Sequence, residues 1–322
     1  MTDTAPPTDS ATHPTVQLGD NPPIPPLGVG TWAWGDSIYW GYGKGYDRAE
    51  LERAYRASID AGIELFDSAE IYGTGTSERL LRDFARTTDT RPQFATKFFP
   101  YPWRWTRRQL VSALQGSLER LGQSSVALYQ VHWPFPPRSV ETWADALAEA
   151  HDRGLTRAVG VSNYSLQQMK RAQQALQKRG LRLASNQVEY SLLQRSPERN
   201  GLLRACRDMG VVLIAYSPLA QGLLTGKYDA DNPLPGIRGR RYNDKLERYT
   251  PLIDTLRDLA AKYDKTPAQV SLNWLIRQGT LAIPGAKNAK QAAQNAGALG
   301  WQLSSDDAGQ LGEVATQVKS SS

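Results

Sequence analysis

Short apolar runs alternate with longer amphipathic segments along most of the chain. Each short run has the length and the apolar content of a strand that is buried on both faces. Each longer segment repeats its apolar residues with the spacing of one helix face. Eight runs are therefore predicted as strands, over residues 27–31, 63–67, 94–97, 126–132, 158–162, 184–188, 211–216 and 281–284.

The segments between these runs begin at residues that cap helix N-termini. A Ser or Thr followed three positions later by Gln forms a capping box, in which a side-chain oxygen accepts a hydrogen bond from a free backbone N–H. Glycine commonly ends a helix because it adopts the left-handed conformation at no steric cost. Helix starts are predicted at Asp47, Thr106, Ser165, Ser196, Thr266 and Asn288, and helix ends at Gly62, Gly122, Gly180 and Gly279.

Repeated β/α alternation predicts parallel strands, because each helix returns the chain to the sheet edge from which it started. Eight repeats within residues 27–322 favour a single α/β domain, a (β/α)8 TIM barrel, over an open sheet. An open doubly wound sheet is the alternative, and it normally carries a glycine fingerprint after its first strand. Gly41, Gly43 and Gly45 do not have that spacing and are interpreted as a flexible loop.

Residues 1–26 precede the alternating pattern and are rich in proline and threonine. They contain no Lys or Arg and no apolar core, so they do not form a secretory signal. They are predicted to be a disordered tail in front of a barrel domain of residues 27–322.

The composition is ordinary for a globular chain, with 40% hydrophobic and 22% charged residues among 322. No apolar stretch approaches the roughly 20 residues of a membrane helix. The net charge of +6 comes from scattered basic residues and one short cluster at Arg238, Arg240 and Arg241, which is interpreted as solvated surface. Nucleic-acid and membrane partners are therefore not expected, although a mild positive field suits a cofactor that carries phosphate.

Cysteine and histidine are scarce. The single cysteine, Cys206, excludes an intrachain disulfide and favours a cytoplasmic location. Of the three histidines, His13 lies in the tail and His151 near a predicted helix end, so no metal site is expected. The oligomeric state is left open.

Ionisable side chains stand at the ends of three successive predicted strands. Asp67, Lys97 and His132 each come where an apolar run stops, and Tyr72 follows Asp67 by five residues. The carboxyl ends of barrel strands converge on one face, so these side chains are expected to meet there. Polar strand ends alone explain the pattern less well, because lone buried charges are costly unless they are paired.

These four residues have the chemistry of carbonyl reduction without a metal. Lys97, held in place by Asp67, is expected to lower the pKa of the Tyr72 phenol. Tyr72 then protonates a carbonyl oxygen as hydride reaches the carbon, and His132 donates a hydrogen bond to the same oxygen. Two other interpretations stay open: a structural Lys97–Asp67 ion pair beside a loop tyrosine, and a Schiff-base aldolase built on Lys97.

The segments around these residues closely resemble the aldo-keto reductase superfamily. The resemblance extends from about residue 27 to residue 311, and its order and completeness make it specific. It is closest to the microbial and plant branch that includes pyridoxal reductases and the potassium-channel β subunits. The matching segments are residues 66–73, 95–97, 128–133, 160–163, 186–191, 215–222, 266–269 and 283–285.

The resemblance implies NADP(H) bound in an extended form and a catalytic tetrad of Asp67, Tyr72, Lys97 and His132. Ser162, Asn163 and Gln187 would hold the nicotinamide carboxamide, and Tyr216 would stack under the ring. Residues 217–227 would line the pyrophosphate, and residues 284–295 would hold the adenosine phosphate. The full set implied for the cofactor is Gly30, Thr31, Trp32, Asp67, Ser162, Asn163, Gln187, Tyr216, Ser217, Leu219, Gln221, Gly222, Lys227, Pro284, Gly285, Lys287, Gln291 and Asn295.

The adenosine-phosphate segment departs from the pattern of many relatives. Gly285 and Ala286 follow Pro284 where Lys-Ser is common, and Gln291 stands where an arginine is expected. Lys287 and the following helix N-terminus still supply positive potential. NADPH is therefore predicted as the cofactor in preference to NADH.

The implied activity is the reduction of aldehydes or ketones to alcohols. Trp32, Tyr72, Phe98 and Trp133 are predicted to form an aromatic substrate pocket, which suits a small aromatic aldehyde such as pyridoxal. A non-catalytic NADP(H)-sensing regulatory subunit, as the channel-subunit relatives suggest, is kept as an alternative besides the aldolase.

Overall fold

Eight parallel strands pair in the order in which they occur along the chain. The structure, a computed structural model, describes residues 14–320. Strands β8 and β1 are joined by parallel bridges from Leu27 to Ala282 and from Gly30 to Gly285, so the sheet closes into the predicted barrel. The strands are β1 (Val29–Gly30), β2 (Leu65–Asp67), β3 (Gln93–Phe98), β4 (Leu128–Val131), β5 (Val159–Ser162), β6 (Ser185–Glu189), β7 (Val212–Tyr216) and β8 (Leu281–Ile283).

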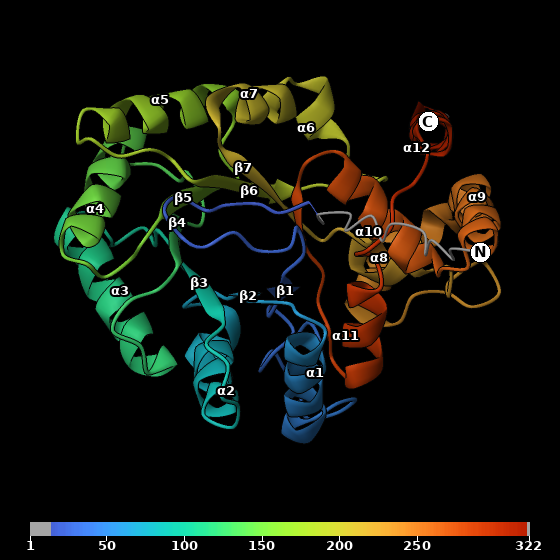
Figure 1. Cartoon of the computed structure of the whole chain (residues 1–322), viewed down its shortest axis with the longest axis horizontal. Coiled ribbons are helices and arrows are strands. Elements are labelled where there is room, and N and C mark those ends of the chain that lie inside the picture. The colour runs from blue at the N-terminus through green and yellow to red at the C-terminus, as the bar shows by residue number, and fades with distance from the viewer. Residues whose placement is uncertain (1–13, 321–322) are drawn as a thin grey trace, which may run out of the picture.

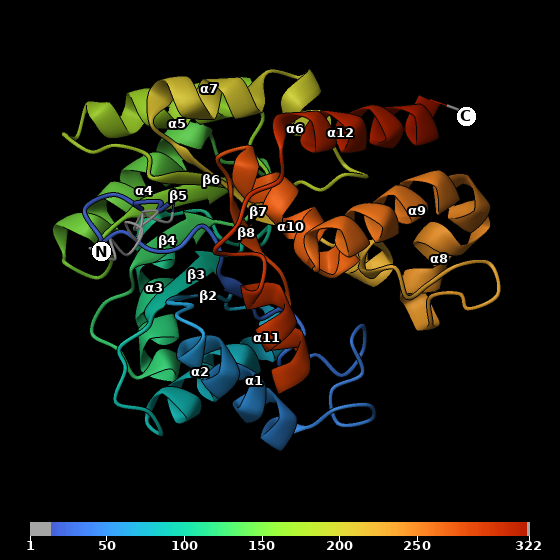
Figure 2. The same ribbon diagram turned by 45° about the vertical axis from the view of Figure 1, so that its right-hand side comes forward.

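Helices surround the strands, and α9 and α12 pack together to one side of the barrel (Figures 1 and 2). The helices are α1 (Arg48–Asp60), α2 (Thr76–Ala85), α3 (Arg107–Leu121), α4 (Val140–Asp152), α5 (Leu166–Gln177), α6 (Ser196–Arg199), α7 (Leu202–Met209), α8 (Gly239–Tyr242), α9 (Leu246–Tyr263), α10 (Pro267–Arg277), α11 (Ala289–Ala296) and α12 (Ser305–Ser320). Four short 3-10 turns are η1 (Tyr72–Gly75), η2 (Ala220–Thr225), η3 (Gly236–Arg238) and η4 (Asn243–Lys245). None of these helices within residues 14–320 is long and apolar enough to span a bilayer.

The predicted helix caps are confirmed at five of the six starts. Each of the five side chains accepts a hydrogen bond from the backbone N–H three residues on, and each predicted glycine follows shortly after its helix with a positive φ. The helix that begins at Ser196 is a single turn, because Gly201 at φ +77° breaks the chain before α7. The confirmed caps are Asp47, Thr106, Ser165, Thr266 and Asn288.

Residues 14–26 do not form the disordered tail that the sequence suggests. Val16 and Ile24 pair in a short antiparallel hairpin, and Leu18 and Ile24 are buried in the barrel interior with Leu65 and Leu128. Asn21 donates to the carbonyl of Ala127 at 2.9 Å, just before β4. The prediction is therefore wrong for residues 16–26, which close the amino-terminal end of the barrel; residues 1–13 lie outside the described part of the chain.

Candidate active site

A cavity of about 490 Å³ opens at the carboxyl ends of the strands. Every residue that the sequence assigned to the cofactor lines it, from Gly30 on the first strand to Asn295 on α11. Tyr72, His132 and Trp133 line the same cavity, whereas Lys97 lies beneath it. The strands thus bring the predicted residues to one place, as the convergence of barrel strand ends requires.

The floor of the cavity is a buried ion pair between Asp67 on β2 and Lys97 on β3. Lys97 has no exposed surface, and its Nζ also donates to the Ser68 carbonyl at 2.7 Å. Amide nitrogens of Gln130 and Gln187 donate to Asp67 Oδ1 at 3.1 and 2.9 Å. Burial lowers the pKa of Lys97, and the Asp67 carboxylate opposes that change. A buried pair with further hydrogen bonds on both partners is rigid, because breaking it would leave a charge without a partner.

Tyr72 and His132 stand above this pair. Lys97 Nζ lies 5.1 Å from the centre of the Tyr72 ring, and the Tyr72 and His132 ring centres are 5.9 Å apart. No group among residues 14–320 accepts a hydrogen bond from the Tyr72 hydroxyl, which stands at the cavity. His132 is 9% exposed, and its Nδ1 is buried without a partner in the same described range. The four predicted residues therefore do meet.

The pKa of the Tyr72 phenol is raised, whereas the sequence predicted that it would be lowered. Burial raises the pKa of Tyr72, and the negative charge of Asp67 raises it further. Burial therefore outweighs the lowering that was expected from Lys97. Burial, and next the charge of Lys97, hold the pKa of His132 well below its ordinary value. Near neutral pH both rings are therefore uncharged, and each has a proton to donate.

A network of amides and hydroxyls borders the Tyr72 end of the cavity. Asn163 adopts a left-handed conformation at φ +62°, which asparagine tolerates better than most residues. Its Nδ2 donates to the His132 carbonyl at 3.0 Å, and its Oδ1 accepts from the Tyr216 hydroxyl at 3.0 Å. Ser162 donates to the Gln187 carbonyl at 2.9 Å. Asn163 thus ties the backbone of His132 to Tyr216 on β7.

The segment after β7 holds several residues in the left-handed region. Ser217, Ala220 and Gln221 have φ of +50°, +47° and +57°, and Gly222 has φ +106°. Such conformations are costly for residues other than glycine, and they cluster where a ligand or a catalytic group must be approached closely. The Gln221 carbonyl accepts from Arg238 Nη1 at 3.0 Å, which fixes this turn.

Two cations, Lys287 and Arg238, line the part of the cavity beside Trp40, which we call its outer end. Burial, and next the charge of Arg238, lower the pKa of Lys287 to about 8. The sequence identified Lys287 but placed Arg238 on a solvated surface; that interpretation fits Arg240 and Arg241, which are exposed, and is wrong for Arg238. The only sequence signal for Arg238 was the basic cluster itself.

Comparison with known proteins identifies the chain by its sequence as well as by its fold. The model of the aldo/keto reductase family matches residues 26–316. The chain belongs to the aldo/keto reductase family. The chain is therefore an oxidoreductase, as the resemblance implied.

The similarity to individual relatives covers nearly the whole of this aldo/keto reductase. A pyridoxal reductase of Arabidopsis thaliana is 40% identical over 302 residues, which are 89% of this chain and 82% of that protein. A glycerol dehydrogenase of Gluconobacter oxydans superposes with a TM-score of 0.82 at 26% identity, over 94% of this chain and 95% of that one. An aldo/keto reductase of Klebsiella pneumoniae, crystallised with NADP and acetate, superposes with a TM-score of 0.75 at 29% identity over the same shares.

One predicted pocket residue of this aldo/keto reductase is misplaced. Phe98 is fully buried outside the barrel, where its ring lies 4.9 Å from that of Trp143 on α4. Successive strand residues face opposite sides, so Lys97 inside the barrel requires Phe98 outside it. Trp32 and Trp133 do line the cavity, and Trp40 and Ile71 complete its apolar wall.

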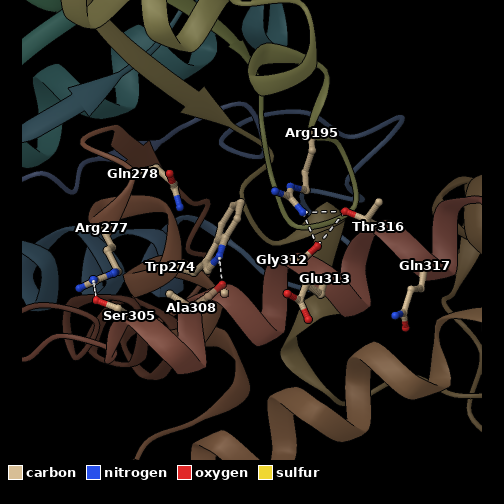
Figure 3. Close-up of a pocket in the computed structure, with 11 residues that line it drawn as sticks. Arg195, Trp274, Arg277, Gln278, Ser305, Ala308, Gly312, Glu313, Thr316 and Gln317 are labelled. Carbon is tan, nitrogen blue, oxygen red and sulfur yellow. Dashed lines mark hydrogen bonds between the residues drawn. The ribbon is translucent and has the colours of Figure 1, made fainter.

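A second depression, of about 610 Å³, lies between α10 and α12, on the side of the reductase (Figure 3). Arg195 in it already bonds the Gly312 carbonyl, Thr316 and Glu198. Arg277 donates to the Leu303 carbonyl and to Ser305. These bonds fasten α12 to the barrel, so the depression is a structural seam. Within the described residues no three His, Cys, Asp or Glu side chains gather as a metal site would require.

Proposed function

We propose that this aldo/keto reductase uses NADPH to reduce aldehydes and ketones to alcohols, with Tyr72 as the proton donor. One observation carries the proposal: an unengaged phenol and a neutral imidazole stand over a buried ion pair, in a cavity that Lys287 and Arg238 also line. The NADP and acetate bound by the Klebsiella pneumoniae relative support both the cofactor and a small substrate that presents an oxygen.

The lining of the cavity fits a nicotinamide dinucleotide. Asn163 and Gln187 offer amide groups for a carboxamide, and Gln187 Oε1 has no partner among residues 14–320. Tyr216 offers a ring face, and Gly222 lets the backbone approach a pyrophosphate. When bound, the cofactor supplies the hydride.

Tyr72 carries out the proton transfer in this proposal. Its raised pKa keeps the phenol protonated near neutral pH, so it can protonate a carbonyl oxygen that becomes more basic as reduction proceeds. His132 stays neutral and donates a hydrogen bond to the same oxygen, which orients the carbonyl. The Asp67–Lys97 pair acts through position: it holds a fixed dipole under the Tyr72 ring.

The choice of NADPH over NADH rests on Lys287 and Arg238. Both cations line the outer end of the cavity, where the extra phosphate of NADPH would lie. Gln291 supports them indirectly, because its Oε1 accepts from the Lys287 backbone N–H at 2.8 Å. The arginine missing from the sequence at position 291 is thus replaced by Arg238, from a different loop.

The substrate we propose is a small aromatic aldehyde, with pyridoxal as the first to test. Trp32 and Trp133 provide apolar ring surface next to Tyr72. The Arabidopsis thaliana relative, named as a pyridoxal reductase, supports this choice. A cytoplasmic location stays a prediction, since that relative is named as chloroplastic.

The aldolase alternative finds little support in the geometry. A Schiff base needs a lysine nitrogen that reaches a substrate carbonyl. Lys97 Nζ is enclosed by Asp67 and the Ser68 carbonyl and does not line the cavity. No observation favours a non-catalytic regulatory subunit, since the family and the reductase-named relatives indicate an oxidoreductase.

The test follows the loss of the reduced nicotinamide absorbance with pyridoxal, other aldehydes and ketones, using NADPH and then NADH. We expect Tyr72→Phe to lower kcat by about a hundred- to ten-thousandfold, because the proton donor is lost, with NADPH affinity unchanged. Tyr249→Phe, on the remote helix α9, is the matched control and should retain full activity. A Tyr72→Phe enzyme with the parent kcat would overturn the role of Tyr72 as proton donor, and the absence of turnover with any carbonyl would overturn the proposed substrate class.

A further inference from the structure

The long loop between β1 and α1 reaches the cationic end of the cavity. The Tyr39 hydroxyl donates to Gln221 Oε1 at 2.8 Å, and Lys287 Nζ donates to the Trp40 carbonyl at 3.3 Å. The loop therefore contacts both the segment after β7 and the segment after β8, and both segments line the cavity. Trp40 itself lines the cavity.

Trp40 lies against both cations. Lys287 Nζ is 4.6 Å from the centre of the Trp40 ring and 4.5 Å from that of Tyr46. The Arg238 guanidinium carbon is 5.5 Å from the Trp40 ring centre. An aromatic face attracts a cation electrostatically within about 6 Å, and the attraction grows when water is removed. Two like charges thus lie against the same indole.

Lys287, Arg238 and the Trp40 indole form a cluster of hydrogen-bond donors that have no negatively charged partner within the described residues. Neither Lys287 nor Arg238 forms an ion pair within the described residues. Asp36 raises the pKa of Lys287 by less than burial and Arg238 lower it, and its Oδ1 is occupied by the backbone N–H groups of Tyr39 and Trp40. The Trp40 Nε1 is buried and, in the same described range, has no acceptor. A cavity wall with two unpaired cations and an idle N–H is suited to an anion.

We propose that Trp40 is a specificity-determining residue for the cofactor, which holds Lys287 and Arg238 as a preorganised pair for a phosphomonoester dianion. The inference rests on the proposed NADPH-dependent function, which places the adenosine ribose at this end of the cavity. Ring faces hold the cations without neutralising them, as a carboxylate would, so their charge stays available to the phosphate. Fixing both side chains before the ligand arrives removes an entropic cost from binding.

The test compares two fragments that differ only by the 2′-phosphate, adenosine 2′,5′-bisphosphate and adenosine 5′-monophosphate, by titration calorimetry. We expect Trp40→Leu to weaken the bisphosphate by about five- to tenfold and the monophosphate by less than about twofold, because the two cations must then be ordered when the 2′-phosphate binds. Trp40→Phe keeps a ring face and should retain most of the preference. Trp103→Leu, at a tryptophan that is 65% exposed on another loop, is the matched control and should change neither affinity.

The outcomes separate this inference from the function on which it rests. A wild-type protein that binds both fragments equally would overturn the NADPH preference and the role of Trp40 with it. A wild type that prefers the bisphosphate, with a Trp40→Leu variant that prefers it by the same factor, overturns the role of Trp40 alone. Equal weakening of both fragments also overturns it, since Trp40 would then merely support the loop. If Trp40→Leu does not fold, Trp40→Phe is tested instead. The proposal is overturned if that variant no longer prefers the bisphosphate over the monophosphate.

Discussion

The two ends of the active-site cavity are built on different principles. At the inner end, Asp67 and Lys97 project from strands, are buried, and satisfy each other with the help of Gln130 and Gln187. At the outer end, Lys287, Arg238 and Trp40 project from loops and have no anionic partner among residues 14–320.

The difference indicates whether the polar groups at each end have their partners before or only after a ligand binds. The inner end needs no ligand to satisfy its charges, so its dipoles are already oriented for the reaction, which is the condition for electrostatic catalysis. The outer end has donors without acceptors, so an anionic ligand completes it. Substitutions at the inner end should therefore affect folding, and those at the outer end should affect ligand affinity.

Lys97→Met gives the largest expected effect on stability. It leaves the Asp67 carboxylate buried without a countercharge, and we expect the free energy of unfolding to fall by about 3–5 kcal/mol. Urea denaturation followed by circular dichroism measures this loss. Lys170→Met, at an exposed lysine of α5, is the matched control and should change stability little.

A double variant sharpens that prediction. Asp67→Asn together with Lys97→Met removes both charges, so we expect it to recover part of the stability that Lys97→Met loses. If Lys97→Met and Lys170→Met denature at the same urea concentration, the inner ion pair is not the rigid floor that its geometry suggests.

The site residues on the strands could be predicted from the sequence, because apolar runs and their polar ends are visible in short stretches of the chain. Asp67, Lys97 and His132 are each visible as the polar end of an apolar run. Barrel closure then brings them together without further information. The capping boxes at Thr106, Ser165 and Thr266 are likewise complete within four residues.

The remaining features depend on contacts between distant segments. Arg238 reaches Trp40 and the Gln221 carbonyl across the cavity, and a short basic cluster does not reveal this. In the sequence, Leu18 and Ile24 lie within a polar segment that resembles a tail. Their packing partners come from strands far along the chain, at the amino-terminal end of the barrel. The raised pKa of Tyr72 comes first from burial and next from the charge of Asp67, and the sequence reveals neither that burial nor that proximity.

The outer end should show a proton-linked affinity. The pKa of Lys287 is about 8 in the ligand-free protein, because burial and Arg238 lower it more than Asp36 raises it. A bound 2′-phosphate, fully ionised at this pH, would raise that pKa again. Below pH 8 the lysine is already charged and affinity is flat; above pH 8 binding must take up a proton, so NADPH affinity should fall by up to about tenfold per pH unit.

Fluorescence titration of NADPH and NADH across this pH range measures the effect. NADH lacks the 2′-phosphate and should show a flat profile. Lys287→Arg keeps its charge at every accessible pH, so it should remove the slope while it retains NADPH binding. Equal slopes for both cofactors would show that another group titrates, and would argue against Lys287 as the phosphate ligand.

The smallest predicted effect concerns Phe98 and Trp133, two aromatic residues that were both predicted from the sequence to line the substrate pocket. Phe98 packs outside the barrel against Trp143, so we expect Phe98→Leu to lower the free energy of unfolding by about 1 kcal/mol and to leave KM unchanged. Trp133 lines the cavity, so Trp133→Leu should raise KM for an aromatic aldehyde while stability changes by less than about 0.5 kcal/mol. Urea denaturation and steady-state kinetics on both variants check the pair. If Phe98→Leu instead raised KM with stability unchanged, the strand register that turns Lys97 inward and Phe98 outward would be wrong.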